Sequence, residues 1–144
     1  MPDVTVTVID PELRRTREEA ILALLEVENT GAVERLAEVF PHPRYELIGN
    51  NRVYDGIEEC TRYLHDRAAA FPDYRGELIA YYHADDAVIA EVWISGTHLG
   101  GIEAVVPSGK GFRCRMAAFF LFDGPRLTCQ RVYFDHATIA RQLA

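Results

Sequence analysis

Lysine is nearly absent from this 144-residue sequence, because Lys110 is the single one. The other basic residues are arginines that form no clustered block, and 22 acidic against 15 basic residues leave a formal net charge of −7. Proteins that bind nucleic acid use clustered Lys and Arg side chains to neutralise the phosphates. The composition therefore argues against nucleic acid as a partner.

Long apolar runs are also missing. No stretch approaches the roughly 20 apolar residues that a membrane-spanning helix needs. The first residues, Met1 to Val4, show no cationic region followed by an apolar one, so no secretory signal is predicted. We therefore expect a soluble, cytoplasmic protein without membrane contact, folded as one domain over residues 1–144.

Cysteine is scarce and widely spaced. Cys60, Cys114 and Cys129 form no C-x-x-C pair, which argues against a disulfide framework and a zinc ribbon. The five histidines lack the spacing of an H-E-x-x-H site, and the sequence has no P-loop, G-x-G-x-x-G or G-x-S-x-G motif. We therefore expect no metal, no nucleotide cofactor and no serine nucleophile.

Helical periodicity dominates the first half of the chain. Asp10-Pro11 is typical of a helix start, and Thr16 to Glu19 forms a capping box that offers a competing start. Apolar residues at helical spacing continue to Asn29-Thr30-Gly31, where this helix is expected to end. A short helix is predicted over 33–40, and a third one runs from Asp55 to Phe71.

The second half alternates with the period of β-strands. After Asp73 the pattern predicts strands over 75–84, 87–101, 111–123 and 126–135, and then a helix over 136–143. Helices followed by long antiparallel strands indicate an α+β fold. Long strands curl, so we expect a cone in which the N-terminal helices pack on a curved, mainly antiparallel sheet around an internal pocket. Strand 112–122 is apolar on both faces, which favours a homodimer.

Asp135 is the first candidate for chemistry. It alternates with Arg131 and Tyr133 on one face of the last predicted strand. If this face lines the cavity, aromatic surroundings would raise the pKa of the Asp135 carboxyl and make it an acid or base near neutral pH. The alternative is that Asp135 caps the final helix, which begins just after it.

His98 is the second candidate, in the glycine-rich segment Gly96 to Gly101. A histidine there could donate a hydrogen bond to a carbonyl oxygen or exchange a proton. The alternative is a ring that hydrogen-bonds to loop backbone at the sheet edge. Tyr45, Trp93, Phe119 and Tyr133 are expected to be core or to line a pocket for a flat, apolar ligand, and His83 could do the same. Glu91, in mid-strand, either pairs across strands or faces the cavity.

The order and spacing of several short motifs resemble those of one family, the SnoaL-like polyketide cyclases of the wider NTF2-like or ketosteroid-isomerase-like superfamily. The resemblance covers the chain from about Ala20 to its C-terminus. The features that carry it are Gly56 after Tyr54-Asp55, Phe71-Pro72-Asp73, Gly96-Thr97-His98-Leu99-Gly100, Pro107-Ser108-Gly109, Phe122-Asp123-Gly124, Asp135 and Gln142-Leu143.

The resemblance implies a cone-shaped, often dimeric α+β fold with an apolar pocket and no cofactor. It implies an intramolecular aldol ring closure on a hydrophobic carbonyl compound, with Asp135 as general acid or base and His98 in the pocket. Glu91 departs from the family, in which the residue two before the tryptophan is commonly basic, and this change of charge implies a different substrate if the Glu91 side chain faces the pocket. The alternatives are a non-catalytic binding or dimerisation module and a hydrolase or dehydratase on the same scaffold.

Overall fold

A computed structural model describes residues 9–101 and 106–144, so the expectation about Met1 to Val4 lies outside the described residues. Four α-helices and six strands occur within these ranges. The helices are α1 (Pro11–Thr30), α2 (Leu36–Val39), α3 (Gly56–Ala70) and α4 (His136–Leu143), with 3₁₀ turns η1 (Val33–Arg35) and η2 (Ile48–Asn50). The strands are β1 (Arg44–Leu47), β2 (Arg52–Asp55), β3 (Arg75–His83), β4 (Ala87–Thr97), β5 (Gly111–Asp123) and β6 (Arg126–Phe134).

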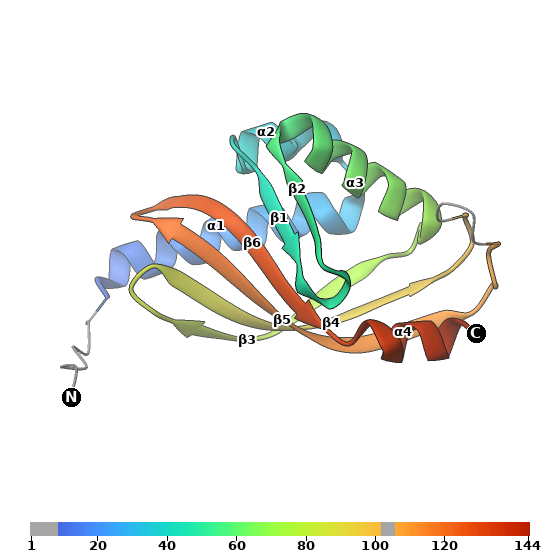
Figure 1. Ribbon diagram of the computed structural model, residues 1–144. Helices are drawn as coiled ribbons and strands as arrows, with labels where there is room; N and C mark the ends of the chain where they lie inside the picture. The colour runs from blue at the N-terminus through green and yellow to red at the C-terminus, as the bar shows by residue number, and fades with distance from the viewer. Residues whose placement is uncertain (1–8, 102–105) are drawn as a thin grey trace.

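All six strands form one curved sheet in the order β2-β1-β6-β5-β4-β3. The pair β1–β6 is parallel and the other four neighbouring pairs are antiparallel, so the sheet is mixed. Figure 1 shows α1 and α3 on the same side of this curved sheet, with α4 at the end of β6. The expected α+β architecture, with helices on a curved and mainly antiparallel sheet, is confirmed.

Two strands were not predicted from the sequence. β1 and β2 have four residues each, which is too short for a period of two to stand out, and β2 is mostly exposed. The strand predicted over 87–101 ends at Thr97. Helix α1 begins at Pro11 and not at the capping box, although the Asp10 side chain makes no capping hydrogen bond.

Strand alternation divides the sheet into an inner and an outer face. Along β4 and β5 the fully buried side chains alternate with partly exposed ones. The inner side chains pack against apolar residues of α1 and α3 in one core, which includes Ile21, Leu24, Leu64, Val92 and Phe120. The outer side chains of β4 and β5 stay partly exposed within the described residues.

Two of the motifs quoted above meet in space at the end of β4. The Asp73 carboxylate accepts hydrogen bonds from the backbone N–H and the hydroxyl of Thr97, both at 2.7 Å. The backbone N–H groups of Leu99 and Gly100 donate to the Ala70 carbonyl at 3.0 and 3.1 Å. The glycine-rich segment thus fastens the end of β4 to the C-terminus of α3.

Candidate functional site

Asp135 lies at the surface, between β6 and α4. Its carboxylate accepts hydrogen bonds from the Ala137 backbone N–H at 3.1 Å and from the Thr138 hydroxyl at 2.5 Å. These hydrogen bonds, that of the Thr138 side chain first, lower the pKa of Asp135. The helix-capping alternative is confirmed, and the expected burial with a raised pKa is wrong because this carboxyl stays in solvent. A catalytic role for Asp135 stays a prediction.

Replacing Asp135 by alanine is expected to lower the melting temperature, because the first turn of α4 loses its side-chain cap. Asparagine keeps a side-chain oxygen for the same N–H group, so Asp135→Asn should stay closer to the wild type. Thermal unfolding of both variants followed by circular dichroism measures the difference. Equal melting temperatures for the two variants would contradict the capping role.

Four of the predicted pocket residues lie on the outer face of the sheet. Glu91 and Trp93 alternate with the buried inner residues of β4, and Phe119 and Tyr133 contact each other at a ring-centroid distance of 5.3 Å. The Trp93 ring lies beneath two guanidinium groups, with Arg113 at 3.7 Å and Arg115 at 4.8 Å from its centroid. The structure does not bring these four residues to the interior, because their strand register directs them outward. Their contact with substrate stays a prediction.

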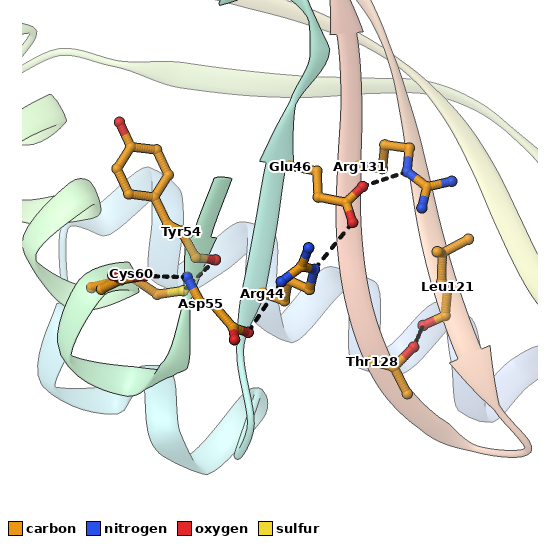
Figure 2. Close-up of polar contacts among 9 residues, drawn as sticks. Arg44, Glu46, Tyr54, Asp55, Cys60, Leu121, Thr128 and Arg131 are labelled. Carbon is orange, nitrogen blue, oxygen red and sulfur yellow. Dashed lines mark hydrogen bonds and ion pairs between the residues drawn. The ribbon is translucent and has the colours of Figure 1, made fainter. Parts of the chain in front are cut away.

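Charged side chains join β1 and β6 on this outer face. Figure 2 shows Glu46 accepting a hydrogen bond from Arg131 at 2.6 Å and from Arg44 at 3.1 Å, with Asp55 on the far side of Arg44. The hydrogen bond from Arg131 is the main reason why the pKa of Glu46 is lowered. This network holds the two parallel strands together and leaves Glu46 fully ionised, so it is not a proton donor near neutral pH.

His98 is buried behind the end of α3. Its ring lies 5.4 Å from the Phe71 ring, and its Nδ1 accepts a hydrogen bond from the Ser108 backbone N–H at 3.4 Å. Its Nε2 has no partner among the described residues. The hydrogen bond to loop backbone was the alternative interpretation of His98, and the structure has it. A role of His98 in proton transfer stays a prediction.

His83 lies near the opposite end of the sheet, against α1. Its Nε2 is 2.9 Å from the Glu18 carboxylate, and its Nδ1 is buried without a partner in the described part of the chain. His83 and Gly76 lie toward opposite ends of β3, and the Gly76 carbonyl accepts a hydrogen bond from Asn29 of α1 at 3.0 Å. A substrate contact of His83 stays a prediction.

A pocket of about 280 Å³, partly open to solvent, lies between α1 and α3, and we call it the α1–α3 pocket. Its polar wall comes from the last turn of α1 and from the end of α3, and its apolar wall from α3 and the segment that follows. The lining residues are Glu28, Asn29, Thr30, Gly31, Leu64, Arg67, Ala68, Phe71, Pro72 and Tyr74. A wider groove between α1 and β3, lined by Leu22, Arg75 and Glu77 among others, is more open to solvent. Its lining contains no buried acid or base.

Glu28 is the buried acidic residue among those that line the α1–α3 pocket. It is 8% exposed, and its Oε2 accepts a hydrogen bond from the Tyr45 hydroxyl at 3.0 Å. Tyr45 is in turn packed against Tyr63 of α3, at a ring-centroid distance of 5.6 Å. Four elements (α1, β1, α3 and β6) and the segment after α3 therefore supply one polar cluster, whose members are Glu28, Tyr45, Tyr63, Arg67, Tyr74 and Gln130.

Burial raises the pKa of Glu28 above its ordinary value of 4.5, and the charge of Arg67 and hydrogen bonds from Tyr45 and Gln130 offset only part of this effect. The Oε1 atom of Gln130 is buried without a donor among the described residues. If the side-chain amide of Gln130 is flipped so that its oxygen faces Glu28, a protonated Glu28 can donate a hydrogen bond to that oxygen. The site thus favours a glutamic acid that holds its proton to higher pH than a surface glutamate does.

This raised pKa predicts a pH dependence of stability. Between pH 4.5 and the raised pKa the folded chain binds more protons than the unfolded chain. The stability that protonated Glu28 contributes is therefore fully present below about pH 4.5. It is lost as the pH rises through the raised value.

Urea unfolding of the wild type and of the Glu28→Gln variant at a series of pH values tests this point. The free energy of unfolding of the wild type should fall relative to that of the variant as the pH rises. A difference that does not change with pH would mean that Glu28 titrates alike in the folded and unfolded chain.

The sequence-based search named one member of this cluster, Tyr45, and missed the others. Glu28 occupies a helix position that reads as one more charged residue, and Arg67 and Tyr63 lie on a helix rich in polar residues. The available signal was the spacing of Leu24, Leu25 and Glu28, since a residue three or four positions after buried leucines shares their helix face. That spacing places Glu28 toward the core.

Neither a metal centre nor a membrane span is found in the described ranges. Within residues 9–101 and 106–144, no three side chains of His, Cys, Asp or Glu converge as metal ligands would. None of the helices there has the length and apolar character needed to cross a bilayer.

Comparisons with known proteins place the chain among proteins of one fold. The family model of the SnoaL-like polyketide cyclases matches residues 18–143. A candidate SnoaL-like polyketide cyclase from Jannaschia sp. CCS1 superposes with a TM-score of 0.82 at 18% identity, over 95% of this chain and 96% of the other. No protein with curated function matches the sequence.

Two further solved structures share the fold. IdmH, a candidate polyketide cyclase from Streptomyces antibioticus, has a TM-score of 0.73 and 24% identity, over 88% of this chain and 97% of that one. A protein with a ketosteroid isomerase-like fold from Catenulispora acidiphila, solved with trimethylamine, has a TM-score of 0.74 and 17% identity, over 87% and 92%. At these identities the structural likeness concerns the fold alone.

Proposed function

The chain belongs to the SnoaL-like polyketide cyclase family, and from this premise we propose that it is a cofactor-independent enzyme that moves a proton on a hydrophobic carbonyl compound and thereby closes a ring in an aldol-type step. The observation that carries the proposal is the buried Glu28 carboxyl, which lines the α1–α3 pocket and accepts a hydrogen bond from the Tyr45 hydroxyl. A carboxyl whose pKa is raised toward neutrality is suited to general acid–base work.

The proposed reaction uses one proton twice. The Glu28 carboxylate removes a proton from the carbon next to the substrate carbonyl, and the electron pair moves onto the carbonyl oxygen as an enolate. Tyr74, which lines the same pocket, has a hydroxyl group that can donate a hydrogen bond to that oxygen. The enolate carbon then forms a bond to a second carbonyl carbon, and the protonated Glu28 returns its proton to the alkoxide.

In this proposal Glu28 takes the role that the sequence-based prediction assigned to Asp135. The two carboxyls differ in the property that matters, because burial raises the pKa of Glu28 while hydrogen bonds lower that of Asp135. A carboxylate whose pKa lies below its ordinary value is a weaker base for a carbon acid than one whose pKa is raised. The pocket volume of about 280 Å³ lies just under the range for drug-sized ligands, which favours a substrate of one or two rings.

We further propose that the enzyme is a cytoplasmic homodimer. The outer face of the sheet carries partly exposed aromatic rings, including Trp93, Phe119 and Tyr133, beside the charged groups Glu91 and Arg131. Aromatic and arginine side chains are enriched at the core of protein interfaces. Size-exclusion chromatography with light scattering measures the mass of the particle in solution.

Proton removal can be tested without knowing the natural substrate. In D₂O, an enzyme of this kind should exchange the methyl protons of an aryl methyl ketone such as 4-acetylbenzamide, which proton NMR follows as loss of the methyl signal. The expected result is exchange with the wild type above the rate in buffer and above that with an equal amount of an unrelated protein. Binding of the ketone without any such acceleration would instead favour the non-catalytic binding module.

A further inference from the structure

Arg67 is the positively charged residue among those that line the α1–α3 pocket. It lies in the last turn of α3, and its guanidinium stacks on the Tyr74 ring, 3.7 Å from the ring centroid. The Tyr63 ring lies on another side, at 5.6 Å. Contacts with two rings hold the planar group in one orientation and leave its N–H groups along the edge of the plane.

No acidic side chain of residues 9–101 and 106–144 forms an ion pair with this guanidinium. Glu28 is the acidic residue of the same pocket, and it interacts with Arg67 through its charge without direct pairing. Because burial raises the pKa of Glu28, this residue carries less negative charge than a surface glutamate at the same pH. Within the described residues, the Tyr74, Tyr63 and Glu28 side chains stabilise the positive charge of Arg67 without a directly paired carboxylate.

We propose that Arg67 makes this pocket selective for carbonyl substrates that carry a carboxylate, which pairs with the guanidinium while the carbonyl lies toward Glu28. The inference rests on the proposed function for the role of Glu28, but the recognition of an anion depends on Arg67 alone. A guanidinium offers two parallel N–H groups that match the two oxygens of a carboxylate. Because contacts with the Tyr63 and Tyr74 rings already hold the guanidinium plane, little conformational freedom is lost when such a partner binds.

A single negative charge fits this site better than a phosphate does. The pocket has one cation, Arg67, and a neighbouring acid, Glu28, whose ionisation a second negative charge would oppose. The net charge of −7 also works against anions at long range, so the attraction must come from direct contact. A carboxylate of modest size meets both conditions.

Two probes of nearly equal shape separate the anion from the ketone. 4-Acetylbenzoate carries a carboxylate, and 4-acetylbenzamide carries a neutral amide in its place. Isothermal titration calorimetry with the full chain should give a dissociation constant about 10- to 100-fold lower for the acid than for the amide. The variant Arg67→Met should lose this preference and bind the two probes alike.

The matched control is Arg62→Met, which removes an exposed arginine from the same helix and should keep the wild-type preference. Arg67→Lys keeps the charge but not the paired N–H groups, so it should keep only part of the preference; it also serves if Arg67→Met does not fold. The proposal is overturned if the wild type binds both probes equally, if it binds neither, or if Arg67→Met retains the preference.

The exchange assay separates this inference from the function on which it rests. Tight, Arg67-dependent binding of the acid without proton exchange would uphold the anion site and reject proton transfer by Glu28. Exchange on both probes with equal KM would uphold proton transfer and reject the anion site.

Discussion

Replacing Glu28 by glutamine is expected to lower kcat for methyl-proton exchange by about 10²- to 10⁴-fold, the usual contribution of a general base. Glutamine has the shape of the glutamic acid and can still accept the hydrogen bond from Tyr45, but it cannot take up a proton. Because Gln130 has a buried oxygen without a donor, its amide can accept a hydrogen bond from the new side-chain NH₂ group. The fold should therefore be kept while the rate falls.

Two other carboxyls show whether this loss is specific. Glu26→Gln changes an exposed acid on the same helix, in the wall of the open groove, and should keep the wild-type rate. Asp135→Asn retains the helix cap and decides between the two assignments of the base. A large loss with Asp135→Asn and an unchanged rate with Glu28→Gln would restore Asp135 as the catalytic residue and reject the interior one.

Replacing Gly100 by alanine is expected to lower the free energy of unfolding by about 2–4 kcal/mol, which is large for a single methyl group. A Cβ atom at this position would lie 2.0 Å from the Ala69 carbonyl oxygen and 2.8 Å from its carbon. Backbone atoms cannot turn aside as a flexible side chain does, so the segment must leave its place. The hydrogen bonds of Leu99 and Gly100 to the Ala70 carbonyl would then lengthen or break.

For a domain of this size the change corresponds to a melting temperature lower by about 6–12 °C. Gly111→Ala is the matched control, because a Cβ there would meet the Gly96 carbonyl oxygen at 3.6 Å, which is ordinary contact. Differential scanning calorimetry of both variants gives the comparison. A melting temperature of Gly100→Ala within about 1 °C of the control would show that the end of β4 is not fastened to α3 as described.

Much of the fold could be predicted because most of its elements are long. α1, α3 and the four strands from β3 to β6 repeat their apolar residues often enough for the period to show. β1 and β2 could not be found in this way, because each has only four residues, and β1 joins the sheet by pairing with β6, about eighty residues further along the chain. The register of the sheet depends on such long-range pairing too.

The site was harder to predict than the fold. Strand alternation correctly grouped Arg131 and Tyr133 on one face, whereas Asp135 lies beyond the end of β6; nor does alternation say which face the helices cover. The interior cluster joins Glu28, Tyr45 and Arg67 from three elements, and their separation in sequence hides the contact. The glycine-rich segment around His98 was predicted to be part of the site because of its histidine. Its glycines Gly96 and Gly100 instead allow the end of β4 to pack closely against Phe71 and the backbone of α3.

The central claim is that the carbonyl compound binds in the α1–α3 pocket and that Glu28 removes its proton there. A crystal structure of the protein soaked with 4-acetylbenzamide tests it most directly, because the neutral probe does not depend on pairing with Arg67. The account predicts the ketone inside this pocket, with its methyl carbon beside the Glu28 carboxyl. Density for the probe beside Asp135, or beside Trp93 on the outer face of the sheet, with the α1–α3 pocket empty, would contradict it.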